Sequence, residues 1–456
     1  QRTLREGGSR AARGNLVTPT MQAIALGGGS LINSAICARP PAWVFDKWAE
    51  RTGVEGVTRE VLDPHFDRVE AQLGVEPTPE EVQGERNLRF KIGCEALGLK
   101  PEPTWRNVQG CKGSAECFTG CRNGAKKSTD VSYVPAAMRA GARVYCSVRC
   151  EGVTMDGKRA TGIVGRVVTP FTLTPRGRVQ IKAKLVVLAA GCMATPLLLM
   201  RSGIGNRKWV GKYLRFHPGL AVMAMFPEPI HPWQGATQGY HCLDMLREGL
   251  KFEVLWSPPA VLATRLPGLG HAYQEHLLRY DHLAPFDVIC AADASSGEVR
   301  PRRGSWDPDI RWHFAQEDVD IMREGLGVLS DICWAAGAEC ILPGLHGVPE
   351  VIRSKDEARV IRTHALKADH TIAASNHAFC TTRMSHAPER GVVDELGKLH
   401  DVDNVYVSDT GNFAASSGVN PMLLCMALAD RIAQGIAQRL ESEELPGGER
   451  SAPLLW

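Results

Sequence analysis

The stretch KLVVLAAGCMATPLLLMRSGIGN, residues 184–206, decides the fold class that the sequence predicts. Its first half is a continuous apolar run, which is typical of a strand buried in a parallel sheet. Gly191 then marks a turn, and the segment continues as a short helix. A buried strand, a glycine turn and a helix together predict an α/β sheet with a ligand at the strand ends. Gly191, Thr195 and Pro196 interrupt the apolar run, which falls short of the roughly 20 residues that a bilayer span needs.

The composition of the whole chain indicates a large globular protein. Its 456 residues are enough for two or three domains, or for one two-lobed unit, and 44% of them are hydrophobic. The formal net charge is only +3, and no basic run is interleaved with aromatic residues, so we expect no nucleic-acid partner. Because the apolar run at 184–206 is interrupted, we also expect no transmembrane segment. Fourteen cysteines, mostly in apolar segments, suggest reduced core thiols and hence a cytoplasmic location.

Several other segments have clear periodicity. Residues 58–75 and 317–337 predict helices that end at glycines, and residues 142–169 predict a hairpin that turns at Asp156-Gly157. Alternating strand-like pieces between residues 217 and 315 predict an antiparallel sheet. Residues 1–14 are basic and contain glycine, so we expect them to be flexible.

Three consecutive glycines, Gly27, Gly28 and Gly29, follow an apolar run and precede Ser30 and Asn33. Because glycine has no side chain, this loop is suited to the close approach of a ligand to the backbone.

The last long helix has a sharply defined predicted start, because Asn420 is a good N-cap and Pro421 suits the first helical position. A helix N-terminus carries about half a positive charge and several free N–H groups. It therefore favours an anion, a phosphate or a ring that becomes negative on reduction. An ordinary capped helix that packs its apolar face explains the same residues.

The stretch SNHAFCTTRM, residues 375–384, places His377 among small and apolar residues. His377 is either a polar core residue or a proton acceptor held against a reactive group, and the residues alone favour the core histidine. A nucleophilic role for Cys380 is disfavoured, because side chains three residues apart on an extended segment diverge.

Four separated segments resemble the glucose-methanol-choline (GMC) flavoprotein oxidoreductases, in that family's order. LGGGSLIN at 26–33 is similar to its flavin loop, and residues 184–206 with VGKYLRFHP at 210–218 are similar to its central signature. HAFCTTRM at 377–384 and residues 391–421 are similar to its carboxy-terminal signature. Any one of these matches is weak, but the four occur in register.

The resemblance implies the cofactor FAD and the oxidation of a primary or secondary alcohol by hydride transfer to the flavin. It assigns His377 as the general base and Asn420 as the donor that holds the substrate oxygen. A neutral imidazole with a reference pKa of about 6.5 is a suitable base near neutrality. Some relatives are hydroxynitrile lyases, in which the flavin is not reduced, and this alternative stays open.

The resemblance also implies the cofactor contacts and the division of the chain. Asp409 is expected beside the pyrophosphate and ribityl chain, although an Asx-turn also explains it; His217 is expected to be structural. The expected FAD contacts are Gly27, Gly28, Gly29, Ser30, Asn33, Cys150, Ala190, Gly191, Asp409, Thr410, Pro421 and Met422. The expected fold is an incomplete, Rossmann-like FAD lobe (15–40, 129–216 and 399–443), a helical and cysteine-containing region (41–128) and an α+β substrate lobe with an antiparallel sheet (217–398).

A loop with three cysteines, Cys111, Cys117 and Cys121, precedes a Gly-Ala-Lys sequence and resembles the branch with long-chain alcohol oxidases and related bacterial dehydrogenases. Three thiolates are able to hold an iron–sulfur cluster, as in sugar dehydrogenases of the wider family. Structural or free thiols are favoured instead, because the loop has neither a C-x2-C pair nor a fourth ligand.

One expected feature is missing from the sequence. Flavoproteins of this kind begin with a strand, a G-x-G-x-x-G turn and a helix that together bind the pyrophosphate, and no such unit occurs here. The unit is on another chain, or was lost by truncation or processing, or the protein is a cofactor-poor, noncatalytic subunit. The expected partners are thus an alcohol, an electron acceptor (oxygen or a carrier) and, in the first case, a second chain.

Overall fold

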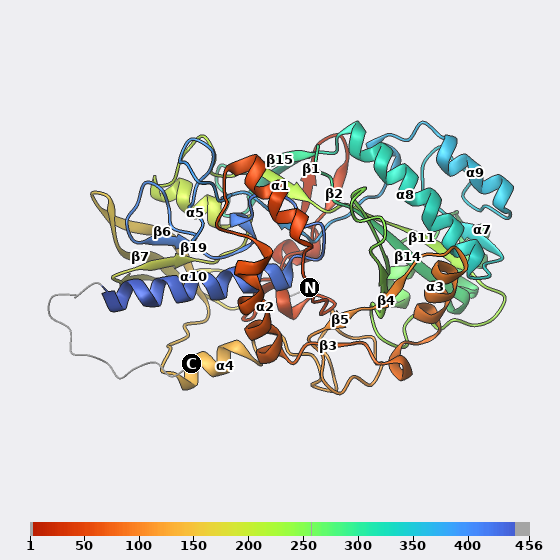
Figure 1. Cartoon of the computed structure of the whole chain (residues 1–456), viewed down its shortest axis with the longest axis horizontal. Helices are drawn as coiled ribbons and strands as arrows, with labels where there is room; N and C mark the ends of the chain where they lie inside the picture. Colours follow the sequence, from red (N-terminus) through yellow and green to blue (C-terminus); the bar gives the residue numbers. More distant parts are fainter. Residues whose placement is uncertain (1–2, 257, 443–456) are drawn as a thin grey trace.

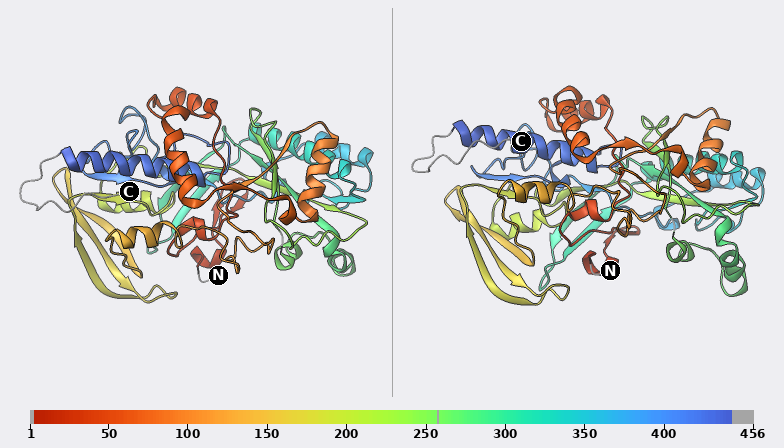
Figure 2. Two further views of the ribbon diagram at one scale, coloured as in Figure 1. Left: turned by 60° about the horizontal axis from the view of Figure 1, so that its bottom comes forward. Right: turned by 90° about the horizontal axis from the view of Figure 1, so that it is seen from below.

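The computed structural model describes residues 3–256 and 258–442. The molecule is elongated (Figure 1), and the views in Figure 2 show the amino-terminal segments between its two ends. Residues 148–202 and the last helix form one end, and residues 316–363 contribute to the other. The architecture is mixed α/β, as the sequence predicts.

A six-stranded antiparallel sheet dominates one end, in the order β17-β11-β14-β13-β12-β4. It confirms the antiparallel sheet predicted between residues 217 and 315. Its strands are β4 (Pro101–Pro103), β11 (Gly219–Met225), β12 (Tyr240–Cys242), β13 (Leu250–Val254), β14 (Leu283–Cys290) and β17 (Cys340–Leu342).

The two faces of this sheet differ in chemistry. Apolar side chains such as Leu220, Phe252 and Phe286 join the main core with helices α3 (Glu85–Ala96) and α8 (Gln316–Ala335). Because successive side chains of a strand point to opposite faces, Lys251 and Glu253 of β13 lie on the other face. The sheet therefore presents buried charges on the side away from α3 and α8.

A second six-stranded sheet has the order β18-β10-β15-β16-β1-β2. It corrects, for residues 3–14, the expectation that residues 1–14 are flexible: β1 pairs with β2 and β16, and buried Arg10 donates to Glu6 and Asp307, while residues 1 and 2 lie outside the described residues. Backbone pairing and these ion pairs offset the entropy cost of ordering the segment. The strands are β1 (Ala11–Arg13), β2 (Val17–Pro19), β10 (Lys212–Phe216), β15 (Ser296–Pro301), β16 (Pro308–His313) and β18 (Ala378–Phe379).

The other end is built around a two-stranded parallel sheet, β9 (Val186–Leu188) with β19 (Val405–Val407). Gly191 adopts a φ of 90°, and helix α5 (Thr195–Ser202) follows, so the strand, turn and helix predicted for residues 184–206 are confirmed. The hairpin at Asp156-Gly157 is confirmed by β6 (Val148–Asp156) and β7 (Arg159–Val168), and β8 (Pro175–Lys182) extends it.

Helix α2 (Arg59–Leu73) packs against the last helix, α10 (Met422–Ser442). Thr58 accepts a hydrogen bond from the backbone of Val61, and Gly74 ends α2 in the left-handed conformation, as its sequence predicts. Helix α1 (Ala42–Thr52) contributes Trp48 to the same core. These contacts fix the start of α10 next to the sheets.

The remaining elements are short and lie mostly in connections. They are α4 (Tyr133–Arg139), α6 (Pro259–Ala263), α7 (His271–Leu278), α9 (Lys355–Thr363), β3 (Glu76–Pro77), β5 (Trp105–Arg106) and the 3-10 helices Arg5–Gly8, Gly28–Leu31, Glu80–Val82, Tyr280–His282, Ala368–His370 and Thr410–Asn412.

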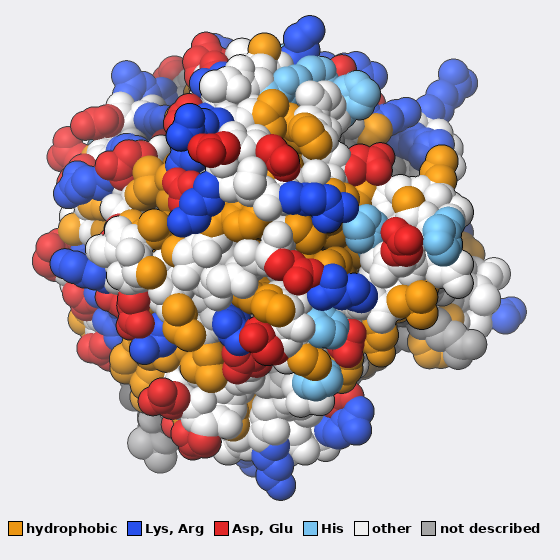
Figure 3. Space-filling view, turned by 90° about the vertical axis from the view of Figure 1, so that its right-hand side faces the viewer, with side chains coloured by type: hydrophobic (Ala, Val, Ile, Leu, Met, Phe, Trp, Pro, Cys, Tyr) orange, Lys and Arg blue, Asp and Glu red, His pale blue; other side chains and the backbone are white. Residues whose placement is uncertain are grey.

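The surface at the end with α3, α7, α8 and α9 mixes acidic and basic side chains (Figure 3). Among the described helices, none is long and apolar enough to span a bilayer.

Candidate active site

His377 immediately precedes β18, and backbone hydrogen bonds fix the chain around it. β18 pairs with β10 through Ala378–Phe216, and Ala374 forms a bridge with Gly219. Thr410 Oγ1 also donates to the carbonyl of Ala378 at 2.7 Å. The histidine is therefore held where the second sheet, the first sheet and the 409–412 loop meet.

The imidazole of His377 is partly exposed, and neither ring nitrogen has a recorded hydrogen-bond partner within residues 3–256 and 258–442. Desolvation by the surrounding protein is the main cause that lowers its pKa to about 4; the charge of Glu253 opposes this shift, and the charge of Lys251 contributes to it to a smaller extent. The ring is thus neutral at pH 7, with one nitrogen free to accept a proton.

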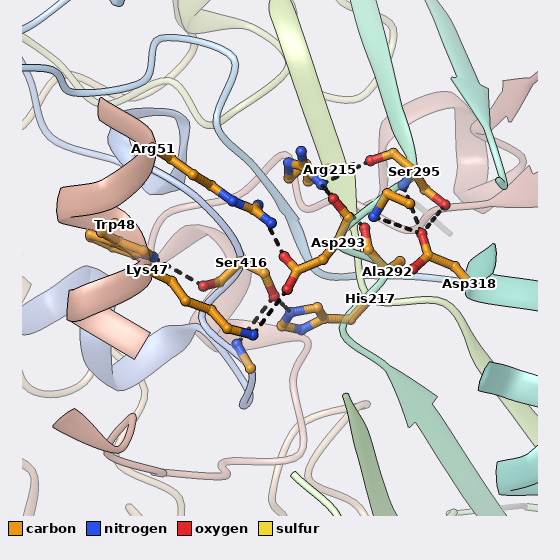
Figure 4. A network of polar contacts seen from close by, with 12 residues as sticks. Lys47, Trp48, Arg51, Arg215, His217, Ala292, Asp293, Ser295, Asp318 and Ser416 are labelled. Carbon is orange, nitrogen blue, oxygen red and sulfur yellow. Dashed lines mark hydrogen bonds and ion pairs between the residues drawn. The ribbon is translucent and has the colours of Figure 1, made fainter. Parts of the chain in front are cut away.

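His217 packs edge-to-face on His377, with ring centroids 5.5 Å apart. Its Nε2 is 2.8 Å from Ser416 Oγ, and Trp48 of α1 donates to the backbone oxygen of Ser416 (Figure 4). Burial lowers the pKa of His217 well below its usual value. His217 therefore packs against His377 as a buried, neutral ring next to the site. This contact with His377 adds to the structural role expected from the sequence.

A polar network next to His217 joins α1 to the second sheet (Figure 4). Arg51 and Lys47 contact the carboxylate of Asp293 at 3.1 and 3.4 Å. The guanidinium of Arg215, on β10, donates to the backbone oxygens of Asp293 and Ser295. These contacts brace the strand that leads to His217.

Asn420 is 7% exposed, and its Oδ1 accepts a hydrogen bond from Lys251 Nζ. Lys251 also forms an ion pair with Glu253, and these two residues are 1% and 3% exposed. Since the charge of Lys251 acts on His377 as well, Lys251 connects the two residues assigned to catalysis. That His377 and Asn420 face the same flavin ring stays a prediction.

The start of α10 differs from the prediction. The helix begins at Met422, and the carbonyl of Pro421 accepts from Cys425 N, so Pro421 precedes the helix. The carboxamide oxygen of Asn420 bonds to Lys251, which takes up the atom that an N-cap would use. A buried ammonium is a stronger partner than a backbone N–H, and it explains the difference.

The charged face of the first sheet was not predicted from the sequence. Cross-strand pairing places His241, Glu253 and Asp287 in one row on β12, β13 and β14. Asp287 is 7% exposed, its side chain has no hydrogen bond to any described residue, and burial, then Glu253, raises its pKa to about 7. Burial lowers the pKa of His241 to about 3, helped by Lys251. Opposite charges two residues apart in the apolar strand LKFEV were the available signal.

The glycine loop packs against other residues at Gly27 and Ser30, and it has open space next to Gly28 and Gly29. Gly27 has a φ of 93°, and a Cβ there would lie 3.0 Å from Asp130, whereas a Cβ at Gly28 or Gly29 would meet no atom within 4 Å. Ser30 Oγ donates to the carbonyl of Gly27 and lies 2.9 Å from Thr129 Oγ1. The backbone is therefore accessible to a ligand on the side where side chains are missing.

Two contacts connect this loop to other parts of the site. Asn33 Nδ2 lies 2.8 Å from Met422 Sδ, which brings the loop to the start of α10. Lys126 donates to the carbonyls of Leu31, Asn33 and Cys117, and burial lowers its pKa to about 8. Lys126 thus ties the glycine loop to the cysteine-containing loop.

Asp409 joins two backbone turns. Its carboxylate accepts from Gly191 N, Thr195 Oγ1 and Gly411 N at 3.0, 2.5 and 2.8 Å, and burial raises its pKa. The contact with Gly411 is the Asx-turn that the sequence left open. Ala190 N bonds to Thr195 Oγ1 in the same turn. Asp409 therefore brings the residues predicted to contact FAD at 190–191 and 409–410 together.

The assigned cysteines have different surroundings. Cys150 is half-buried on β6 and its thiol contacts the carbonyl of Gly152. In the described part of the chain, no three His, Cys, Asp or Glu side chains are grouped so that they could hold a metal ion, and this includes Cys111, Cys117 and Cys121. Cys380 is fully buried, and burial raises the pKa of its thiol to about 12, which disfavours a thiolate nucleophile.

The residues that are expected to lie next to the flavin ring are compatible with a bound FAD. Open glycine backbone at 28–29 and 191, and the start of a long helix at 422, are the features that bind flavins and their phosphates.

Known proteins share sequence and fold with this chain. Two GMC oxidoreductase family models match, the amino-terminal one at residues 1–219 and the carboxy-terminal one at 293–429. A GMC-type oxidoreductase of Mycobacterium tuberculosis (strain H37Rv) is 29% identical over 430 residues, which cover 94% of this chain and 67% of that protein. A long-chain-alcohol oxidase of Arabidopsis thaliana is 26% identical over 92% of this chain and 58% of its own length.

A solved structure shows the same fold at low sequence identity. Pyridoxine 4-oxidase from Mesorbium loti superposes with a TM-score of 0.70 at 17% identity, covering 92% of this chain and 86% of that one. The family models together span well over half of the sequence. The chain therefore belongs to the GMC oxidoreductase family, whose members bind FAD.

Proposed function

We propose that this oxidoreductase oxidises a primary or secondary alcohol, with His377 as the general base and Asn420 as the donor that orients the substrate oxygen. One observation carries the proposal: a neutral imidazole with unpartnered nitrogens lies near a buried lysine that also holds Asn420. The names of two similar proteins, a long-chain-alcohol oxidase and pyridoxine 4-oxidase, support the reaction class.

The residues divide the work on the alcohol between them. His377 takes the hydroxyl proton, which leaves an electron pair on oxygen to form the carbonyl bond. Asn420 donates an N–H to that oxygen and stabilises the negative charge that develops on it. FAD, when bound, accepts the hydride that leaves the same carbon. Proton, hydride and carbonyl product then balance.

The cofactor would be held by loops from separate parts of the chain. Residues 27–33 offer open backbone, the 190–191 and 409–410 turns are joined by Asp409, and Pro421 and Met422 lie at the start of α10. Cys150 would contribute from β6. The positive end of α10 favours a ring that gains negative charge.

A second candidate function, a subunit that depends on a partner, has one specific observation in its favour. Within residues 3–256 and 258–442, the parallel pair β9–β19 has no third strand, and Val187 at the centre of β9 is 44% exposed. Parallel sheets are normally covered on both faces. We propose that a further α/β unit, from the same or another polypeptide, covers this pair and completes the pyrophosphate site. Native mass spectrometry of the purified particle tests this: a second chain that copurifies in fixed ratio supports it, and a flavin-loaded single chain of this sequence contradicts it.

The visible spectrum tests the proposed reaction. Purified protein supplied with FAD is expected to show two flavin bands that bleach anaerobically on addition of an alcohol. Bound flavin that no alcohol bleaches would contradict alcohol oxidation and favour a non-redox relative such as a hydroxynitrile lyase. Failure to retain FAD would favour the partner-dependent subunit.

A further inference from the structure

We propose that Lys251 is a positioning residue: it fixes the orientation of the Asn420 carboxamide so that the amide N–H groups face the substrate. The inference rests on the proposed function, and it assigns a role to a charge that the reaction itself does not require.

The two atoms that form the contact between Lys251 and Asn420 determine how the carboxamide is oriented. Lys251 Nζ donates to Asn420 Oδ1, across 169 positions of sequence. An ammonium has three donors and no acceptor, so only the carboxamide oxygen is able to face it. The amide NH2 must therefore point away from the lysine, which removes the usual ambiguity between the two ends of an amide. No acceptor in the described residues is recorded for Asn420 Nδ2, which leaves its two N–H groups for a ligand.

Lys251 is itself held in place by hydrogen bonds that involve Glu253 and Gln238. Glu253 accepts from Lys251 with one carboxylate oxygen and from Gln238 Nε2 at 2.6 Å with the other. Lys251, Glu253 and Gln238 are all almost fully buried. A buried charge persists only if it is paired and hydrogen-bonded, and this chain of contacts meets that condition. Strand β13, together with Gln238 just before β12, thus determines the position of a residue just before α10.

The orientation of the carboxamide determines which groups face the substrate oxygen. A hydroxyl group accepts through its oxygen and donates its proton, so it needs a donor and an acceptor on different sides. With Lys251 in place, Asn420 offers only donors to the site, and neutral His377 offers an acceptor. A flipped Asn420 would present its carbonyl oxygen, which would compete with His377 for the same proton. Lys251 excludes that arrangement without touching the substrate.

Three variants test the proposal. Lys251→Met removes the donor, and Lys251→Met/Glu253→Gln removes the whole ion pair, which avoids an unpaired buried carboxylate and protects the fold. Lys91→Met is the matched control, because Lys91 forms only an exposed i,i+4 pair with Glu95 on α3. Thermal unfolding of each variant verifies that it is folded.

The first readout is flavin reduction by saturating alcohol. Loss of a fixed donor geometry typically costs on the order of 100-fold in rate. We expect a loss of about that size in kcat for both Lys251 variants, with a smaller change in KM, and no change for Lys91→Met. A folded double variant with the wild-type kcat would overturn the proposal.

The second readout needs neither cofactor nor activity. The groups acting on His377 are Lys251 and Glu253, with the neutral ring of His217 packed against it. NMR titration of the imidazole should show a higher pKa in Lys251→Met than in the wild type, and a crystal structure of Lys251→Met should show a displaced or flipped Asn420. An unmoved Asn420 with an unchanged His377 titration would overturn the role of Lys251 while leaving alcohol oxidation intact. If the wild type is not reduced by any alcohol, the proposed function fails independently of these two measurements.

Discussion

The proposed cofactor side and the proposed substrate side of the site are built in different ways. On the cofactor side, glycines and turn residues at 27–33, 190–191 and 409–412 place backbone groups in fixed conformations. On the substrate side, Lys251, Glu253 and Asp287 act through side chains on one face of an antiparallel sheet. Backbone-based sites restrict which residue types fit, whereas a sheet face accepts any side chain whose partners compensate it. His377 and Asn420 lie where these two sides meet.

Replacing His377 by Ala has the largest expected effect on the rate, and it tests whether the substrate side is separate from the cofactor side. A general base contributes about 10²- to 10⁴-fold, so flavin reduction by alcohol should fall by about 10³-fold. Flavin content should stay close to that of the wild type, because the cofactor contacts lie elsewhere. His271→Ala is the control, since His271 is exposed on α7. Equal loss of flavin and of activity would mean that His377 is structural.

The glycine loop offers the converse experiment on the cofactor side. A Cβ at Gly29 meets no atom of the described protein within 4 Å, and its φ is not in the left-handed region. Gly29→Ala should therefore leave the melting temperature of the flavin-free protein unchanged and weaken FAD binding by about 10-fold, equivalent to about 1.4 kcal/mol. Fluorescence titration with FAD measures the affinity. Unchanged affinity would show that the cofactor does not approach this loop.

The pH dependence of kcat/KM follows from the pKa of His377, which desolvation lowers to about 4. The imidazole accepts a proton only when neutral, so the acidic limb should lie near pH 4, well below the usual value of about 6.5. The same shift affects stability: the contribution of this histidine is complete above about pH 6.5 and is lost as pH falls toward 4. The lowered pKa would be contradicted by an acidic limb near pH 6.5 that disappears only in His377→Ala. His377 would then lie in a more solvated site.

Asp287 gives the smallest expected effect, and it concerns stability. Its pKa is raised to about 7, so its ionised form is disfavoured in the folded protein, and stability falls as pH rises from about 4 to 7. Asp287→Asn should therefore raise the melting temperature at pH 8 by a few degrees and have less effect at pH 5. Calorimetry at the two pH values checks the sign. A variant less stable than the wild type at pH 8 would mean that the carboxylate has a favourable partner.

The difference between the two sides also explains what the sequence was able to predict. Gly27, Gly191 and Asp409 belong to local motifs whose backbone requirements are visible in neighbouring residues, and the turns they predict are present. Lys251 and Asp287 become neighbours of the site only through strand register, which depends on long-range pairing. The helix start at Asn420 was wrong for the same reason, because its partner lies 169 positions away.

The most direct test of the account is a structure of the FAD-loaded protein with an unreactive alcohol analogue. The account predicts that one ligand oxygen lies within hydrogen-bond distance, about 2.6–3.2 Å, of both a His377 ring nitrogen and Asn420 Nδ2. An analogue whose oxygen bonds to neither group, or a flavin ring placed away from both, would contradict it.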